Sequence, residues 1–187
     1  MPSGRTHDRI TLMSLPWLSG GVLLATRSPL QALLFGSTYL FGGLMLSPDL
    51  DIHSLPYKRW GPLRWIWLPY RWAMQHRSML SHGPIVGTVF RLLYLGAWLL
   101  LFGGIGAVAI AQLIAPEHWQ QLSLFQLDRG LLELKTLTLR HPTEALVLYL
   151  GLELGCMSHA LSDWIASAWK RLRRKNSQAN AKHSRRK

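Results

Sequence analysis

Histidine and aspartate residues gather in four short stretches of this 187-residue sequence. The stretches are His7-Asp8, Asp49-x-Asp51-x-His53, His76-x5-His82 and His159-x3-Asp163. They contain four of the five aspartates of a chain that has only nine acidic residues. Imidazole and carboxylate groups are the usual ligands of zinc and similar divalent ions. The sequence therefore predicts a divalent-metal site, with zinc as the expected metal and one or two ions bound.

The last stretch gives the most specific signal, because His159 and Asp163 are four residues apart in a segment predicted to be helical. Residues i and i+4 of an α-helix project from the same face, so both side chains can reach one ion. An imidazole and a carboxylate near the end of an apolar helix are costly unless they face protein, water or a metal. The alternative is a hydrogen bond between the two side chains that only pins the helix.

Asp49, Asp51 and His53 directly follow Ser47-Pro48, where an apolar segment ends. Alternate residues of an extended chain point to the same side, so these three could present two oxygens and a nitrogen together. This stretch therefore predicts metal ligands, with Asp51 also a candidate general base. The alternative has Asp49 capping a turn and Asp51 in solvent.

His76 and His82 precede the longest apolar segment, and their spacing of six does not place them on one helical face. A junction between a loop and a helix would be needed to bring them together. Arg77 between them suits a phosphate or carboxylate partner. The alternative is that both histidines lie exposed at a membrane surface. His7 is a weaker candidate ligand, since a His-Asp pair near a chain end is usually solvated.

Composition indicates a membrane protein with basic edges. The formal net charge is +12, and 49% of the residues are apolar, with nine tryptophans among leucine-rich runs. Charge alone would indicate a nucleic-acid binder, but the apolar runs favour a bilayer. Membrane lipid is the expected partner and nucleic acid is not, because anionic lipid explains the basic residues as well.

Apolar segments predict the fold. Residues 84–115 and 143–169 are each long and apolar enough to cross a bilayer. Two shorter pieces, 12–25 and 30–46, are separated by the turn-like Thr26-Arg27-Ser28-Pro29 and predict a helical hairpin. The alternative for this pair is a buried hairpin in a soluble helical domain. The predicted fold class is all-α, an integral membrane bundle of about four hydrophobic helices.

Two further segments differ from these helices in composition. Residues 54–75 interleave Trp, Tyr and Pro with Arg and predict an interfacial segment at the level of the lipid headgroups. Residues 170–187 carry nine basic residues and no acidic one, which predicts a disordered basic tail. Residues 1–169 then form a single helical membrane domain that contains the His/Asp site.

The distribution of charge predicts the orientation. If all four apolar segments cross the membrane, the four His/Asp stretches lie on one side, together with most of the lysine and arginine residues. The positive-inside rule places that side in the cytoplasm. The predicted location is therefore a bacterial-type inner or plasma membrane, with the site and the tail cytoplasmic.

The motifs THD, SPDLDIH, HRSMLSH and SHALSDW together resemble those of uncharacterised membrane-bound metal-dependent hydrolases and their metal-binding relatives, over about residues 5–166. Those families are distantly similar to zinc-dependent phospholipases C and zinc-dependent single-strand nucleases, which use His/Asp clusters to cleave phosphodiesters. The metal ligands that this resemblance implies are His7, Asp49, His76, His82, His159 and Asp163, with Asp51 and His53 as close alternates.

Two functions fit these observations. The first is a membrane-embedded, metal-dependent hydrolase of a phosphate ester, with Asp51 or Asp49 as base and Arg77 as the contact to the anionic substrate. The second is a non-catalytic metal-binding membrane protein, such as a sensor, chaperone or assembly factor. A transporter fits less well, because mainly Arg91 and Glu153 lie deep in the apolar segments. Glu153 is expected to support the metal ligands or to pair with Arg91.

Overall fold

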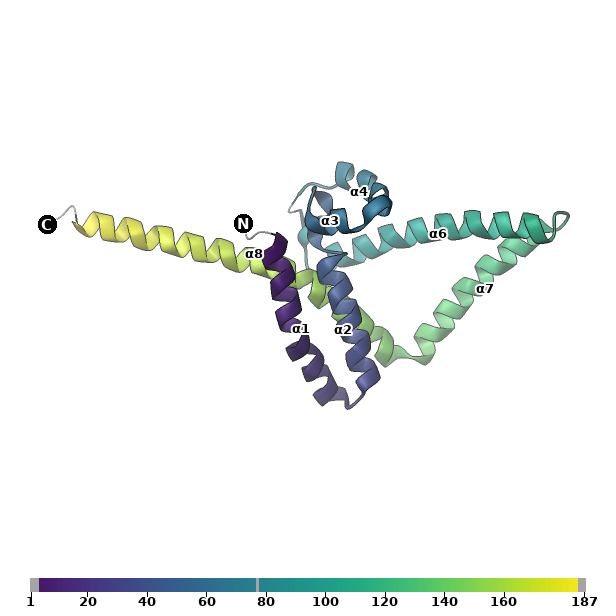
Figure 1. Cartoon of the computed structure of the whole chain (residues 1–187), viewed down its shortest axis with the longest axis horizontal. Coiled ribbons are helices and arrows are strands. Elements are labelled where there is room, and N and C mark those ends of the chain that lie inside the picture. Colours follow the sequence, from purple (N-terminus) through teal and green to yellow (C-terminus); the bar gives the residue numbers. More distant parts are fainter. Residues whose placement is uncertain (1–3, 77, 185–187) are drawn as a thin grey trace.

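The computed structural model describes residues 4–76 and 78–184, and these residues form helices and no strands. The elements in chain order are α1 (Gly4–Thr26), α2 (Pro29–Leu44), η1 (Pro48–Asp51), α3 (Leu55–Arg59), η2 (Gly61–Trp67), α4 (Leu68–Ala73), α5 (Met79–His82), α6 (Val86–Ile114), α7 (Trp119–Arg140) and α8 (Pro142–Ser184), where η denotes a 3-10 helix. The prediction of an all-α fold is confirmed. Figure 1 shows α1 and α2 lying against α8, while α6 and α7 extend away from them.

α1 and α2 form the helical hairpin that the sequence predicts. Ser28 caps α2, because its Oγ accepts a hydrogen bond from the backbone N–H of Gln31 at 3.3 Å. Pro29 takes the first position of α2, where its missing N–H leaves no hydrogen bond unmade. α1 begins well before residue 12, so His7 lies on a helix and not in a terminal arm.

Glycines bring α2 and α8 into close contact. Gly151 and Gly155 of α8 form a G-x-x-x-G pattern, which lets two helix backbones approach each other. A Cβ atom at Gly155 would lie 2.2 Å from the carbonyl oxygen of Tyr39, and one at Gly42 would lie 2.4 Å from that of Leu152. This contact holds the next turn of α8, which carries candidate metal ligands, beside α1 and α2.

We expect Gly155→Ala to destabilise the fold by about 1–3 kcal/mol, because the added methyl group overpacks the contact between α2 and α8. Gly104→Ala in α6 is the matched control, since a Cβ there meets no described atom within 4 Å. Alanine favours a helix over glycine by about 0.5–1 kcal/mol, so the control should be neutral or stabilising. Thermal unfolding of both purified variants measures the difference. Equal midpoints would contradict this role of Gly155.

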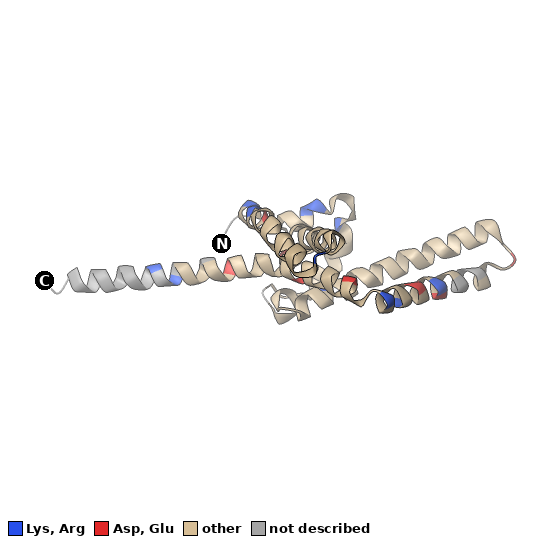
Figure 2. Ribbon diagram, turned by 90° about the horizontal axis from the view of Figure 1, so that it is seen from below, with Lys and Arg blue, Asp and Glu red and all other residues tan. Residues whose placement is uncertain are grey.

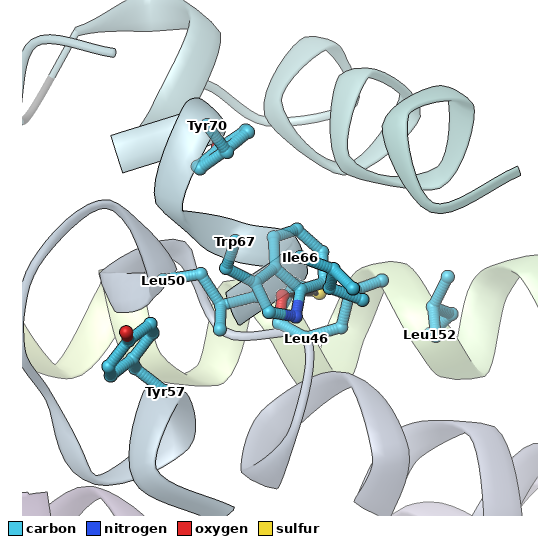
Figure 3. Packing of buried hydrophobic residues seen from close by; sticks show 8 residues of the cluster. Leu46, Leu50, Tyr57, Ile66, Trp67, Tyr70 and Leu152 are labelled. Atoms are coloured by element: carbon cyan, nitrogen blue, oxygen red, sulfur yellow. Dashed lines mark hydrogen bonds between the residues drawn. The ribbon is translucent and has the colours of Figure 1, made fainter. Parts of the chain in front are cut away.

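The tryptophan-rich segment 54–75 folds into α3, η2 and α4 and supplies much of a buried core. Its residues Tyr57, Trp67 and Tyr70 pack with Leu46 and with Leu152 of α8 (Figure 3). Other aromatic side chains of the segment face outward, as Trp72 does. The segment therefore closes the end of the helices where the His/Asp residues lie. Its predicted position at a membrane interface stays a prediction.

α6 is the most apolar long helix, and Arg91 is its only charged residue. It leaves the core at a wide angle to α2, and α7 runs back from its far end toward the start of α8 (Figure 1). Figure 2 shows charged residues along α7. Two of them, Arg129 and Glu133, form an ion pair at 3.2 Å. α7 is not among the predicted helices, because charged residues interrupt its apolar ones.

Three helical segments in the described chain are long and apolar enough to cross a membrane, namely Pro29–Asp51, Val86–Ile114 and Pro142–Trp169. α1, which contains Pro16, is not among them. The structure thus has three such helices where the sequence predicts about four. They do not form one bundle, since α2 and α8 pack together and α6 diverges from both.

The basic end of the chain belongs to α8, which continues as a helix to Ser184. Arg, Lys, Gln and Ala all have high helix propensity, so a segment that is too polar to form a core can still continue a helix.

Candidate metal centre

One group of candidate ligands joins α1 to α8. It consists of His7, His159 and Asp163, whose ligand atoms all lie within 4.8 Å of one another. The Nε2 atom of His7 is 3.3 Å from Oδ1 of Asp163. The rings of His7 and His159 stack with their centroids 3.8 Å apart. His159 and Asp163 share one face of α8, as their i, i+4 spacing predicts.

A second group joins η1 to α5 and to the residue His76 before it. It consists of Asp49, His76 and His82, whose ligand atoms also lie within 4.8 Å of one another. Leu50 is fully buried in the core. Its side chain therefore anchors η1, and the carboxylates on either side of it, Asp49 and Asp51, reach the histidines. A loop followed by a short helix thus brings together two histidines that no single helical face could.

Asp49 connects the two groups. Its Oδ2 lies 3.0 Å from Nε2 of His159 in the first group. Its Oδ1 lies 3.5 Å from Nε2 of His82 in the second group. One carboxylate therefore has an oxygen directed at each candidate metal position, as a bridging ligand would have.

The arrangement of the ligand atoms suits metal coordination better than direct hydrogen bonds between the side chains. Four of them are buried without a hydrogen-bond partner in the described part of the chain: Asp49 Oδ1, His82 Nε2, His159 Nε2 and Asp163 Oδ1. Their close approaches, 3.0 to 3.5 Å, lack hydrogen-bond geometry. Ligands bound at the distances usual for zinc lie about 3.4 Å apart around a tetrahedral ion. Buried polar atoms without partners are costly, and an ion at this point would satisfy them.

Burial keeps the first group in a form that can bind metal. Burial lowers the pKa of His7, and the neighbouring imidazole of His159 lowers it further, while Asp163 opposes both effects. A neutral imidazole is the form that ligates metals. At neutral pH, protons therefore compete little with a metal ion for the lone pair of His7.

Three histidines are oriented by partners on their Nδ1 atoms. Nδ1 of His7 is 2.6 Å from Oγ of Ser162, and Nδ1 of His82 is 2.8 Å from Oγ of Ser81. Nδ1 of His76 lies 3.0 and 3.1 Å from the two oxygens of Asp51. A histidine that donates from Nδ1 keeps its lone pair on Nε2, which is the usual arrangement around metal sites. Ser162 is not among the residues that the sequence predicts for the site, although it adjoins the candidate ligand Asp163.

Two buried charges hold the chain around His82. The backbone N–H of Ile85 donates to Oε1 of Glu153 at 2.8 Å, and Ile85 has a φ of 62°, in the left-handed region. The guanidinium of Arg91 donates to the carbonyl of Ser81 and to Oγ1 of Thr88. Of the two predicted roles for Glu153, this position favours support of the ligand loop.

The oxygens of Asp51 contact His76, and this fits a role in orienting that imidazole more directly than the predicted role of general base. We expect Asp51→Asn to weaken metal binding about 10- to 100-fold, the usual effect of losing a carboxylate that orients a ligating histidine. Competition with a calibrated chelator measures the affinity. Asp128→Asn, on the exposed face of α7, is the control. Unchanged affinity in Asp51→Asn would contradict the orienting role.

Not every residue of the predicted stretches joins the two ligand groups. His53 is exposed and its ring packs against Tyr57, with the centroids 5.3 Å apart. The expected extended loop is a 3-10 helix, η1, so alternate residues do not share a face and His53 turns away. Asp8 accepts from both terminal nitrogens of Arg59, which ties α1 to α3. Arg77 lies outside the described residues.

Two cavities reach the ligand groups. One, of about 380 Å³, is lined by His82 and Asp163, which belong to different groups, and by Arg171. The other, of about 230 Å³, is lined by His7 and Asp49 among others. The ligands are therefore accessible to a small molecule from two directions, whereas a purely structural metal site is usually closed by protein.

These features define a helical protein with apolar helices and a His/Asp site suited to one or two metal ions. Residues 2–173 match the family described as "Uncharacterized metal-binding protein (DUF2227)", and the chain belongs to this family. The predicted membership of a metal-binding family is confirmed. The likeness to zinc-dependent phospholipases and nucleases stays a prediction.

An uncharacterized protein of Aquifex aeolicus (strain VF5) is 44% identical to this chain over 62 residues. The aligned stretch covers 33% of this chain and 43% of that protein. No solved structure matches the chain.

Proposed function

We propose that the protein is a metal-dependent hydrolase of phosphate esters with a two-ion centre in which Asp49 bridges the ions. The observation that carries the proposal is the convergence of six imidazole and carboxylate ligands, four of which have a buried ligand atom without a hydrogen-bond partner in the described part of the chain, beside cavities open to a substrate. Zinc is the proposed metal, because all six side chains are nitrogen and oxygen ligands that it accepts.

The chain's own residues would bind and orient the substrate. Divalent ions in such a site supply a water nucleophile at neutral pH and neutralise phosphoryl charge. Arg171 lines the cavity that His82 and Asp163 also line, and its positive charge suits the anionic group of a phosphate ester there. Arg77, two residues before the start of α5, remains a second candidate for that contact.

We also propose that the protein is embedded in a membrane with the site at its cytoplasmic side. The three apolar segments support this. η1 ends the first, His82 shortly precedes the second, and both His159 and Asp163 lie in the C-terminal half of the third. Basic residues such as Arg5, Lys58 and Arg59 lie near the same ends, and the positive-inside rule favours the cytoplasm for them. Membrane lipid is therefore the proposed partner, and nucleic acid is not.

The test is turnover of bis(p-nitrophenyl) phosphate and related phosphodiesters by purified protein loaded with zinc. We expect hydrolysis that stops after treatment with a chelator and returns on addition of the metal. Asp49→Ala should be inactive, while Asp128→Ala on α7 should keep wild-type activity. Protein that holds its metal but turns over no phosphate ester would reject the hydrolase and support the non-catalytic metal-binding alternative.

A further inference from the structure

An apolar groove lies between α1 and α8 and adjoins the cavity that contains Arg171. Its volume is about 660 Å³, and Ile10 and Leu18 of α1 and Leu154 and Ile165 of α8 line it. All four side chains are more than one-third exposed. The groove is therefore an open channel in the apolar surface, not a sealed packing defect.

Polar groups in the wall of the groove are satisfied by one another. The hydroxyl of Ser14 is 2.6 Å from that of Tyr39. The hydroxyl of Ser158 donates to the carbonyl of Gly155 at 2.7 Å and lies 3.1 Å from that of Thr11. Because these groups bond within the wall, the surface that they offer to an occupant is apolar. A polar or charged ligand would gain little along most of the groove.

The groove has a direction. α1 and α8 run antiparallel, since His7 contacts Ser162 while Thr11 contacts Ser158. The groove runs from Thr6 to Leu18 on α1 and from Leu154 to Trp169 on α8. The twelve residue steps from Thr6 to Leu18 span about 18 Å of helix. A long hydrocarbon chain fits such a length, and the helix that forms one wall, α8, is among those apolar enough to cross a bilayer.

The groove lies beside the metal centre at Ser162. Ser162 contacts His7 at 2.6 Å, and the next residue is the candidate ligand Asp163. Met157 and Leu161 line both the groove and the cavity that contains Arg171. A molecule with its hydrocarbon chain in the groove would therefore have its polar end beside the ligands.

We propose that this groove binds an acyl chain of a membrane phospholipid and that the metal centre acts on the phosphate of that lipid. The proposal rests on the hydrolase function proposed above and names its substrate class. The groove is apolar, it adjoins the metal ligands at Ser162, and it meets the cavity of Arg171 at Met157 and Leu161. A phospholipid with an acyl chain in the groove and its phosphate in that cavity would match both surfaces. An apolar helix of another protein or of a second copy would leave the metal ligands and Arg171 without a matching group.

The test uses phosphatidylglycerol that carries a photoreactive diazirine near the end of one acyl chain. Purified protein is irradiated with a low molar ratio of this lipid, and the labelled residues are mapped by mass spectrometry. We expect label on residues of α1 and α8 that line the groove. Leu154→Trp and Ile10→Trp, from opposite walls, each fill it and should reduce the labelling about tenfold, the effect of displacing roughly two methylene groups.

Leu99→Trp on the exposed surface of α6 is the matched control and should leave labelling unchanged. Label spread evenly over the apolar helices, or unaffected by both groove variants, would overturn the proposal, as would cross-links between two copies through α1 and α8. The soluble phosphodiester assay separates this result from the proposed function. Groove variants should hydrolyse bis(p-nitrophenyl) phosphate at the wild-type rate while KM rises for the phospholipid. If the wild-type protein hydrolyses the soluble ester but the groove is not labelled, the lipid-binding proposal is wrong and the proposed hydrolase function stands.

Discussion

Asp49→Ala is expected to remove both metal ions from the purified protein, a larger loss than any other single ligand substitution. Asp49 directs one oxygen at His159 and the other at His82, so both candidate metal positions depend on it. Without this carboxylate, each position would keep fewer protein ligands and less negative charge to offset a divalent ion. Elemental analysis of protein purified without added chelator gives the metal content directly.

His82→Ala and Asp128→Ala provide the comparison. His82 belongs to one group only, so its loss should leave the ion of the other group in place. Asp128 lies on α7, away from both groups, and should change nothing. If the Asp49→Ala protein contains as much metal as the His82→Ala protein, Asp49 does not bridge the two groups, and each group binds its ion independently.

The parts of the site that depend on local spacing could be predicted from the sequence. His159 and Asp163 share a helical face because an α-helix has 3.6 residues per turn, whatever the rest of the chain does. The paired stretches around Asp49 and His82 were found from residue type alone. Their meeting could not be derived, because it depends on how η1 and α5 pack against α8.

His53 shows the limit of such reasoning. The spacing of Asp49, Asp51 and His53 predicts convergence only if the chain is extended there. Ser47-Pro48 instead starts a 3-10 helix, and Leu50 enters the core, so the carboxylates reach the site and His53 faces solvent. The burial of Leu50 fixes the conformation of η1. This burial depends on the tertiary structure and cannot be predicted from the local sequence pattern.

The fold was predicted where apolar residues form long uninterrupted runs. α7 escaped prediction because its apolar residues alternate with charged ones such as Arg129 and Glu133, which pair on its surface. The wide angle between α6 and α2 has no signal in composition. The Gly151-x3-Gly155 pattern is a sequence signal for the close contact of α8 with another helix, but it was not among the features used to predict the fold.

The double variant His159→Ala with Asp163→Ala is expected to lose the ion of the first group, all turnover of phosphodiesters and the stability that the ion provides. Only His7 of that group would remain, together with one oxygen of Asp49. A ligand present at 1,000 times its Kd stabilises the fold by about 4 kcal/mol, so addition of a chelator should lower the thermal midpoint of the wild type clearly. The same chelator should lower the midpoint of the double variant much less.

The same helix supplies a matched control. His141 and Glu144 form a second histidine–acid pair at the start of α8, with Nδ1 and Oε2 3.9 Å apart, but His141 is exposed and the pair belongs to neither ligand group. His141→Ala with Glu144→Ala should therefore keep the full metal content, the turnover and the response to the chelator. Unchanged metal in the His159 and Asp163 double variant would reject the first ligand group, because a merely structural pair on α8 could be lost without any effect on bound metal.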